Sequence, residues 1–194
     1  MRVLYIYCHP LPESFHAGIR AEALAGLQRA GHEVDLLDLY AEGFDPVLSA
    51  EGRRNYHNVE RNRDGLENYV ERLQRCDAVV LQFPTWCFGM PAMLKGYFDR
   101  VLLPGVSIDL SDPGNVKPLL GNIKKIAGIS TYGRPRWMAL YMGDPSRVMA
   151  TRYLKRLTGG TASVQYHALY NMNVVTDAQR RAFIAKVGTA MERF

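Results

Sequence analysis

Residues 78–101 of the chain read AVVLQFPTWCFGMPAMLKGYFDRV, and this stretch decides the fold class. Its first seven residues form an apolar run, which predicts a strand that is buried on both faces and ended by Pro84. Pro91 suits the first turn of a helix, and Leu94, Tyr97, Phe98 and Val101 line one face of that helix. A buried strand followed by an amphipathic helix is typical of α/β proteins with a parallel sheet.

The same alternation of strand and helix continues on both sides of this stretch. Four further apolar runs predict strands at residues 2–8, 34–39, 126–130 and 163–169. Helices are predicted from Ser14 to the stop at Gly31, from Asp64 to Arg75, from Asp144 to Gly159, and after a capping box at Thr176 to Gln179. Five strands alternating with helices require right-handed crossovers, so we expect an α/β, doubly wound, five-stranded parallel sheet in a three-layer sandwich.

The composition fits one domain over residues 1–194, with polar, irregular segments expected at 40–65 and 104–122. Apolar residues make up 47% and charged residues 22%, which is ordinary for a globular protein. No apolar run approaches the length of about 20 residues that a membrane span needs. We therefore expect a single globular domain with no membrane span.

The cysteines and the first residues favour a reducing compartment. The run from Arg2 to Cys8 is too short and too aromatic for a signal peptide. Cys8, Cys76 and Cys87 show no CxxC spacing and cannot all pair, which indicates free thiols. A cytoplasmic location is the expectation.

The net charge of +5 could attract anions, but it does not take the form of a nucleic-acid interface. The basic residues are scattered, and no run interleaves them with aromatic residues. Nucleic-acid binding is therefore not expected. The sequence also lacks a cluster of His, Cys and Asp residues, so no metal site is expected.

Ligands of such sheets bind beyond the carboxyl ends of the strands, so the loops after the first, third and fourth strands are the candidate site. The first loop runs from His9 to His16 and lacks a GxGxxG motif, which argues against a dinucleotide-binding turn of the NAD type. Free amides at a helix start, the Ser14 hydroxyl and two imidazoles suit a phosphate group. An ordinary capped turn, directed by Pro10 and Pro12, explains the same residues equally well.

The second loop runs from Pro84 to Pro91 and places Trp86, Phe88 and Met90 just after a buried strand. A planar redox cofactor would give these side chains a partner, while an aromatic plug over the end of the sheet is the alternative. Gly89 is expected to allow the close turn that either arrangement needs. Cys87 is a candidate reactive thiol by position, although a small packed residue is the favoured interpretation.

The third loop runs from Ser130 to Trp137. Its hydroxyls and Gly133 can bind the pyrimidine side of an isoalloxazine ring, and Arg134 or Arg136 can stabilise the negative charge that develops there on reduction. A solvated basic loop is the alternative.

Three motifs in these loops together resemble the NAD(P)H quinone reductase family, the DT-diaphorase-like, flavodoxin-2 group. They are HPxPxSF at 9–15, QFPTWCFGMPAMLKGYFDRV at 82–101 and, more weakly, STYGRP at 130–135. This family includes the small ancillary oxidoreductases of potassium-efflux systems. The similarity covers most of the chain and fades in 40–65 and after Pro145.

The resemblance implies a flavodoxin-like fold, a non-covalently bound FMN or FAD, and a homodimer with active sites at its interface. FMN is favoured, with FAD as the alternative. The residues that would contact the flavin are His9, Ser14, Phe15 and His16 at the phosphate, Pro84, Thr85, Trp86, Cys87 and Phe88 on one side of the ring, and Ser130, Thr131, Tyr132 and Gly133 on the other.

The chain departs from the family at two places. Family members often carry Asn where His16 stands. Met142 falls where better-known quinone reductases have a histidine that assists charge relay. Tyr132 or Tyr141 is the candidate to replace it, and no proton donor is assigned.

The expected activity is a two-step transfer of hydride from NAD(P)H to the flavin and then to a quinone or similar small electrophile. Three alternatives stay open. The acceptor can be an azo or nitro compound, the chain can be a flavodoxin-type electron carrier, or it can be a regulatory ancillary subunit that docks on a potassium-efflux transporter.

Overall fold

A computed structural model describes residues 1–112 and 114–194, and its centre is a five-stranded parallel sheet. The strands lie in the order β2-β1-β3-β6-β7, which confirms the expected flavodoxin-like, doubly wound α/β arrangement. Their bounds are β1 (Arg2–Tyr7), β2 (Glu33–Asp38), β3 (Ala78–Pro84), β6 (Lys125–Thr131) and β7 (Ser163–Leu169).

The strand register aligns the three candidate loops. Tyr7 at the end of β1 pairs with Gln82 in β3, and Pro84 at the end of β3 pairs with Thr131 at the end of β6. Strand order reverses between β1 and β3, so the loops after β1, β3 and β6 leave the same edge of the sheet side by side.

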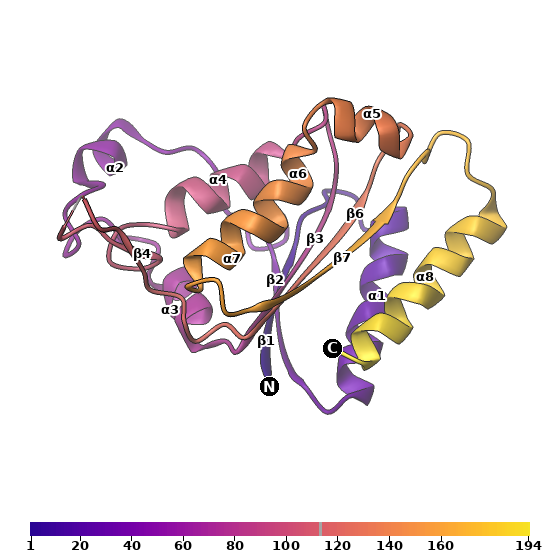
Figure 1. The fold of residues 1–194 in the computed structure, drawn as a ribbon, viewed down its shortest axis with the longest axis horizontal. Coiled ribbons are helices and arrows are strands. Elements are labelled where there is room, and N and C mark those ends of the chain that lie inside the picture. The colour runs from indigo at the N-terminus through magenta and orange to yellow at the C-terminus, as the bar shows by residue number, and fades with distance from the viewer. Residues whose placement is uncertain (113) are drawn as a thin grey trace.

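Helices cover both faces of the sheet (Figure 1). One face carries α1 (Phe15–Arg29) and α8 (Asp177–Glu192). The other face carries α3 (Glu67–Arg75), α4 (Ala92–Val101) and α7 (Leu154–Leu157). A hydrophobic core lies on each face of the sheet. Alternate residues of each strand contribute to the two cores, because successive side chains of a strand point to opposite faces.

The helices α1 and α8 cross in direct contact. A Cβ atom at Gly26 would lie 2.5 Å from the carbonyl oxygen of Gly188, so only glycine permits this approach. Ile19, Ala23 and Leu27 of α1 are buried beside Phe183 and Val187 of α8, which closes this side of the sheet.

The helix ends follow the signals in the sequence. Ser14 caps α1 and accepts a hydrogen bond from the amide of Ala17 at 3.2 Å. Gly31, which follows α1, has the left-handed φ of +73° that favours glycine. Thr176 and Gln179 form the predicted capping box of α8.

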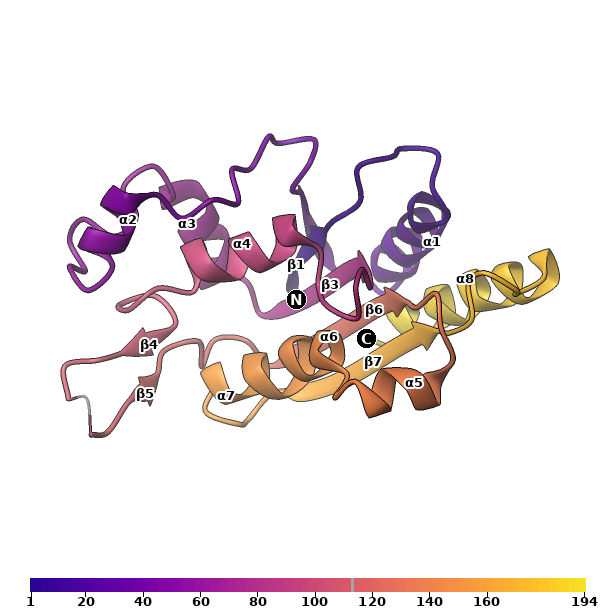
Figure 2. The same cartoon turned by 90° about the horizontal axis from the view of Figure 1, so that it is seen from above.

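The polar segments hold more structure than their sequence predicts. Residues 40–65 contain α2 (Ala50–Asn55), which buries no residue and therefore has no apolar stripe. The predicted loop 104–122, of which residue 113 lies outside the described residues, contains the small sheet of β4 (Ile108–Asp109) and β5 (Lys117–Pro118). Figures 1 and 2 show α2 and this small sheet at the end of the molecule opposite α8.

Two helix predictions were wrong in detail. α3 begins at Glu67, three residues after the predicted start at Asp64. The predicted helix after Asp144 consists of α6 (Pro145–Val148), a π-helix at Met149–Tyr153, and α7. The wider π turn changes which way its residues face, and Tyr153 at its end is exposed.

A further short helix, α5 (Arg136–Tyr141), lies just beyond the carboxyl end of β6. Among the described residues, none of the helices combines the length and the apolar composition that crossing a bilayer requires.

Candidate functional site

His16 ties the first loop to the third. Its ring lies 3% exposed, and Nε2 is 2.9 Å from Oγ1 of Thr131. On the other side of the ring, Nδ1 is 3.2 Å from Nε2 of Gln82 in β3. One buried imidazole therefore joins the loop after β1 to the end of β6.

The hydrogen bonds around Gln82 fix the tautomer of His16. The amide Nε2 of Gln82 donates to the carbonyl oxygen of His16 at 2.6 Å, and its Oε1 accepts from the hydroxyl of Tyr5. With the amide oriented in this way, Nε2 of Gln82 also donates to Nδ1 of His16, so Nδ1 is unprotonated. The ring consequently donates from Nε2 to Thr131.

Burial and, to a smaller extent, the nearby His9 together lower the pKa of His16 to about 3. The ring is neutral at pH 7, and both of its nitrogens already have protein partners. The structure thus gives the His16 ring a joining role in place of the phosphate contact expected from the sequence.

Thr85 ties the second loop to the third. Its amide donates to the carbonyl oxygen of Thr131 at 2.8 Å, and its hydroxyl lies 3.1 Å from that of Ser130. Together with the His16 contact, these bonds hold all three predicted loops against one another. Loops fixed in this way form a rigid frame for a ligand.

The second loop makes a tight turn between Trp86 and Gly89, whose amides and carbonyls are paired at 2.8 Å and 3.0 Å. The left-handed residues are Cys87 (φ +49°) and Phe88 (φ +61°), so the expectation that Gly89 supplies the special turn conformation was wrong. Such backbone costs about 1–2 kcal/mol per non-glycine residue and is often found at functional sites.

Cys87 is exposed, which corrects the expectation that it is a small packed residue. Cys87 is one of the two central residues of the turn between the paired Trp86 and Gly89. Pro84 is buried at the end of β3, Phe88 is half-buried, and Trp86 is partly exposed beside the site.

His9 stands between the first and second loops. Its ring stacks on that of His16 with centroids 5.5 Å apart, and it lies 6.2 Å from the ring of Trp86. Its Nδ1 accepts a hydrogen bond from the amide of Leu11 at 3.1 Å. Partial burial lowers the pKa of His9.

The backbone around these loops fits a flavin nucleotide. Within the described residues, the amides of Phe15 and His16 have no backbone partner at the start of α1, which leaves donors for a phosphate. In the second loop, the amides of Cys87 and Phe88 are likewise without a backbone partner and suit the polar edge of a flat ring. The side chain of Phe15 packs against Phe183 of α8, 6.5 Å between centroids, so the backbone of Phe15 is what it offers to a ligand.

A family model for the flavodoxin-like fold, flavodoxin-2, matches residues 1–190 of the chain. The chain belongs to this family. Membership agrees with the strand order.

Among its relatives, the ribosyldihydronicotinamide dehydrogenase [quinone] of Pongo abelii is 33% identical over 125 residues, which are 56% of this chain and 54% of that protein. The chain therefore spans about half the length of this relative. The NAD(P)H:quinone oxidoreductase of Methanothermobacter marburgensis has a TM-score of 0.83 at 25% identity, with 99% of this chain and 98% of that one covered.

An FMN-dependent NADH-azoreductase from Bacillus anthracis, solved in complex with FMN, shares the fold with a TM-score of 0.75 at 16% identity. The match covers 100% of this chain and 99% of that one.

Of the two tyrosines that are candidate proton donors, one lies in solvent and the other is hydrogen-bonded to protein groups. Tyr141 is 84% exposed at the end of α5. Tyr132 is buried, and its hydroxyl donates to Oδ1 of Asp144 at 2.7 Å and lies 2.6 Å from the hydroxyl of Tyr166. Its ring stacks on Tyr170, 4.6 Å between centroids.

Tyr166 was missed by the sequence analysis. Burial raises the pKa of Tyr166. Its hydroxyl is the donor in the hydrogen bond with Tyr132, because the hydroxyl proton of Tyr132 goes to Asp144. The hydroxyl of Tyr166 in β7 therefore belongs to one hydrogen-bonded group with Tyr132 and Asp144. One signal for it existed, because Gly128 lies opposite Tyr166 in the register and a Cβ there would be 2.5 Å from the ring.

The loop after β7 was also missed as part of the site. The amide of Met172 donates to the carbonyl of Tyr132 at 3.0 Å, and Asn173 lies next to the exposed Gly133. Arg134 and Arg136 are exposed on the third loop. In the described part of the chain, no three His, Cys, Asp or Glu side chains gather to hold a metal ion.

Proposed function

We propose that the chain is a flavin-dependent NAD(P)H:quinone oxidoreductase that binds FMN at the loops after β1, β3 and β6. One observation carries the proposal. The His16–Thr131 and Thr85–Ser130 hydrogen bonds hold the three loops against one another. Among the described residues, the amides of Phe15, His16, Cys87 and Phe88 in these loops have no backbone partner. The quinone-reducing relatives and the FMN-bound structure of the same fold support it.

In this proposal the phosphate of FMN lies at the start of α1. Ser14 offers its hydroxyl, Phe15 and His16 offer their amides, and His9 closes the site from the side. FMN is favoured over FAD because its phosphate alone accounts for the donors at this loop.

The isoalloxazine ring lies between the second and third loops. Pro84 to Phe88 line one side and present the Cys87 and Phe88 amides, while Ser130, Thr131 and Gly133 line the other. Arg134 and Arg136 add positive charge near the pyrimidine side. Bound FMN supplies the hydride chemistry, accepting from NAD(P)H and passing on to a quinone.

The proposal is tested by the visible spectrum of the purified protein after incubation with FMN or FAD and gel filtration. Flavin absorbance retained with the protein is expected, and the retained species identifies the cofactor. Stopped-flow mixing with NADPH or NADH is then expected to bleach the flavin directly, and a quinone to restore its colour. A protein that retains neither flavin contradicts the proposal.

The same experiment separates the alternatives. Faster reoxidation by azo or nitro compounds than by quinones would assign the chain to azo or nitro reduction. Bleaching that requires a separate reductase protein would favour a flavodoxin-type electron carrier.

The homodimer remains part of the proposal. Trp137 (65% exposed), Leu140, Tyr141 and Met142 form an apolar patch on and after α5, beside the third loop. A second copy covering this patch would enclose the ring site. Sedimentation equilibrium is expected to give twice the chain mass of 21.9 kDa, and Trp137→Asp to give the monomer.

We also propose a cytoplasmic location, with docking on a potassium-efflux transporter as a further role. Cys8, Cys76 and Cys87 are all free, and burial raises the pKa of Cys8 and Cys76 to about 12, which keeps both thiols protonated and inert. Cell fractionation tests the location. Pull-down from a membrane fraction tests the docking.

A further inference from the structure

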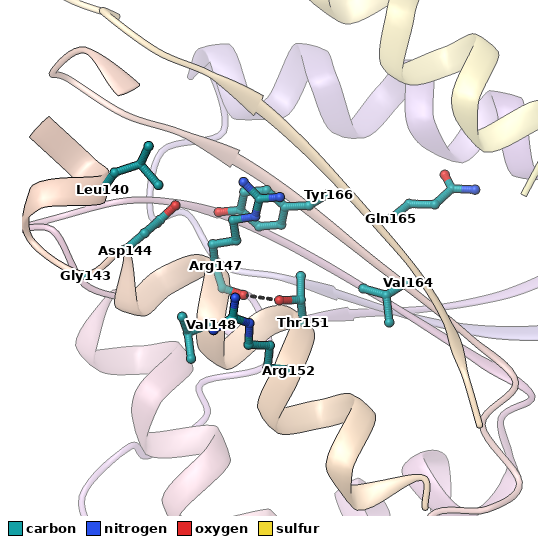
Figure 3. Close-up of a pocket in the computed structure, with 10 residues that line it drawn as sticks. All are labelled: Leu140, Gly143, Asp144, Arg147, Val148, Thr151, Arg152, Val164, Gln165 and Tyr166. Atoms are coloured by element: carbon teal, nitrogen blue, oxygen red, sulfur yellow. Dashed lines mark hydrogen bonds between the residues drawn. The ribbon is translucent and has the colours of Figure 1, made fainter. Parts of the chain in front are cut away.

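A polar cavity lies between the segment after α5 and the edge strand β7. It has a volume of about 440 Å³, and the residues shown in Figure 3 line it. The residues with charged or hydroxyl side chains are Asp144, Arg147, Thr151, Arg152 and Tyr166. The comparisons and the proposed flavin site give none of these arginines a role.

The cavity is positively charged by two unpaired arginines. Within the described part of the chain, neither Arg147 nor Arg152 forms an ion pair with a carboxylate, and no hydrogen bond is donated by either guanidinium. Arg147 lies over the ring of Tyr166, 5.5 Å from guanidinium carbon to centroid. Its planar edge remains available to a ligand.

The π-helix explains why both arginines line one cavity. Arg147 and Arg152 are five residues apart, which in a regular α-helix places side chains about 140° apart around the axis. The i→i+5 turn at Met149–Tyr153 reduces this angle, so Arg152 comes toward the face of Arg147. π turns inside helices are frequent at functional sites.

Asp144 supplies a second kind of contact. It is 4% exposed, and while Oδ1 accepts from Tyr132, Oδ2 is buried without a hydrogen-bond partner. Figure 3 shows its carboxylate on the side of the cavity where Arg147 and Tyr166 lie. An unpaired buried carboxylate oxygen is costly, and a donor from a ligand would remove that cost. Asp144 also has a left-handed φ of +42°, so its backbone is held in an unfavourable conformation to place it here.

We propose that this cavity binds a small oxyanion that also carries a hydroxyl group, such as a phosphorylated polyol or a hydroxy acid. Guanidinium groups bind phosphate or carboxylate through paired N–H donors. Oδ2 of Asp144 accepts from the hydroxyl of the ligand. The proposal depends on the cavity alone and does not require the chain to bind a flavin.

The test is isothermal titration of the protein, with and without bound FMN, against glycerol 3-phosphate and malate. Propyl phosphate and succinate, which lack the hydroxyl groups, are the matched probes. Binding of the hydroxylated probe in at least one pair, tighter than its analogue, is expected. The member that binds, phosphate or carboxylate, identifies the anionic group.

Arg147→Gln and Arg152→Gln are each expected to weaken binding on the order of tenfold, as for the loss of a charge-assisted hydrogen bond. Arg156→Gln, on α7 outside the cavity, is the control and is expected to bind like the wild type. Ser14→Ala separates this cavity from the flavin loop, because a probe bound at the loop would be lost in that variant.

A measurement on the wild-type protein covers the case in which a variant fails to fold. The methyl NMR signals of Val148 and Val164, which line the cavity, are expected to shift as the probe is added. Absence of binding, binding that survives both arginine variants, or shifts that follow protein concentration alone would overturn the proposal. The last of these would mean that a second copy covers the cavity.

Discussion

Nε2 of His16 donates a hydrogen bond to the hydroxyl oxygen of Thr131 across 115 positions of sequence, at a distance of 2.9 Å. Burial, with a smaller contribution from the nearby His9, keeps the imidazole neutral inside the protein. In the unfolded chain the ring is free to take a proton, so folding is linked to pH at this residue.

The first prediction concerns that linkage. The folded-state pKa of His16 is about 3, below the ordinary 6.5. Between these values the unfolded chain binds more protons than the folded one, so the free energy of unfolding falls as pH drops from about 6.5 and is unaffected by this group above that range. His16→Asn is expected to flatten the decline, measured by urea unfolding at pH 7 and pH 5. His57→Asn, at an exposed histidine, is the control and should keep the wild-type decline.

The second prediction separates helix capping from phosphate binding. Ser14 and Ser49 both accept a hydrogen bond from an amide at a helix start, but only Ser14 lies at the candidate site. Each Ser→Ala change is expected to cost about 0.5–2 kcal/mol of stability. Only Ser14→Ala is expected to release FMN on gel filtration. Equal flavin retention in the two variants would reduce Ser14 to a cap.

The third prediction concerns the strained turn. Phe88→Ala is expected to weaken FMN binding by about 1–3 kcal/mol, as for other aromatic truncations at binding sites. Cys87→Gly is expected to raise the stability by about 1 kcal/mol, because glycine adopts the left-handed conformation freely. Cys87→Ala is the matched variant and should show no such gain in thermal unfolding. Equal melting temperatures for the wild type, Cys87→Gly and Cys87→Ala would rule out strain at this turn.

The fourth prediction concerns α4. A Cβ atom at Gly96 would lie 2.3 Å from atoms of Pro46, so the segment before α2 crosses this helix in direct contact. Gly96→Ala is expected to destabilise the protein by about 1–3 kcal/mol, as for overpacked cores. Gly121→Ala meets no atom within 4 Å and is the control. Equal urea midpoints for the two variants would contradict this reading of the contact.

The parallel strands were predictable because they are buried on both faces and leave continuous apolar runs, as in residues 78–84. Helices with an inward stripe were predictable for a similar reason. In contrast, α2 buries nothing and α5 buries only Ala139, so neither shows a helical period of apolar residues. The three loops could be placed at one edge because the carboxyl ends of parallel strands lie at the same edge of a sheet.

The contacts within the site were harder to predict from the sequence. The bond between His16 and Thr131 joins positions far apart in sequence, and no local pattern encodes it. No local pattern encodes the contacts of Tyr132 either. Its place in the third loop indicated a flavin contact, but its hydroxyl forms hydrogen bonds with Asp144 and Tyr166. The prediction for Gly89 was wrong because Cys87 and Phe88 are the residues of this turn that adopt the left-handed conformation.

The tight crossing of α1 and α8 bears on how the protein assembles during synthesis. Val3, Tyr5, Val80 and Ile129 face these two helices, and α8 occupies residues 177–192. Until that segment leaves the ribosome, half of the cover over this side of the sheet is missing, and its apolar surface is open to aggregation. Nascent chains halted before residue 177 should therefore depend on chaperones, because α8 completes the cover over this face of the sheet.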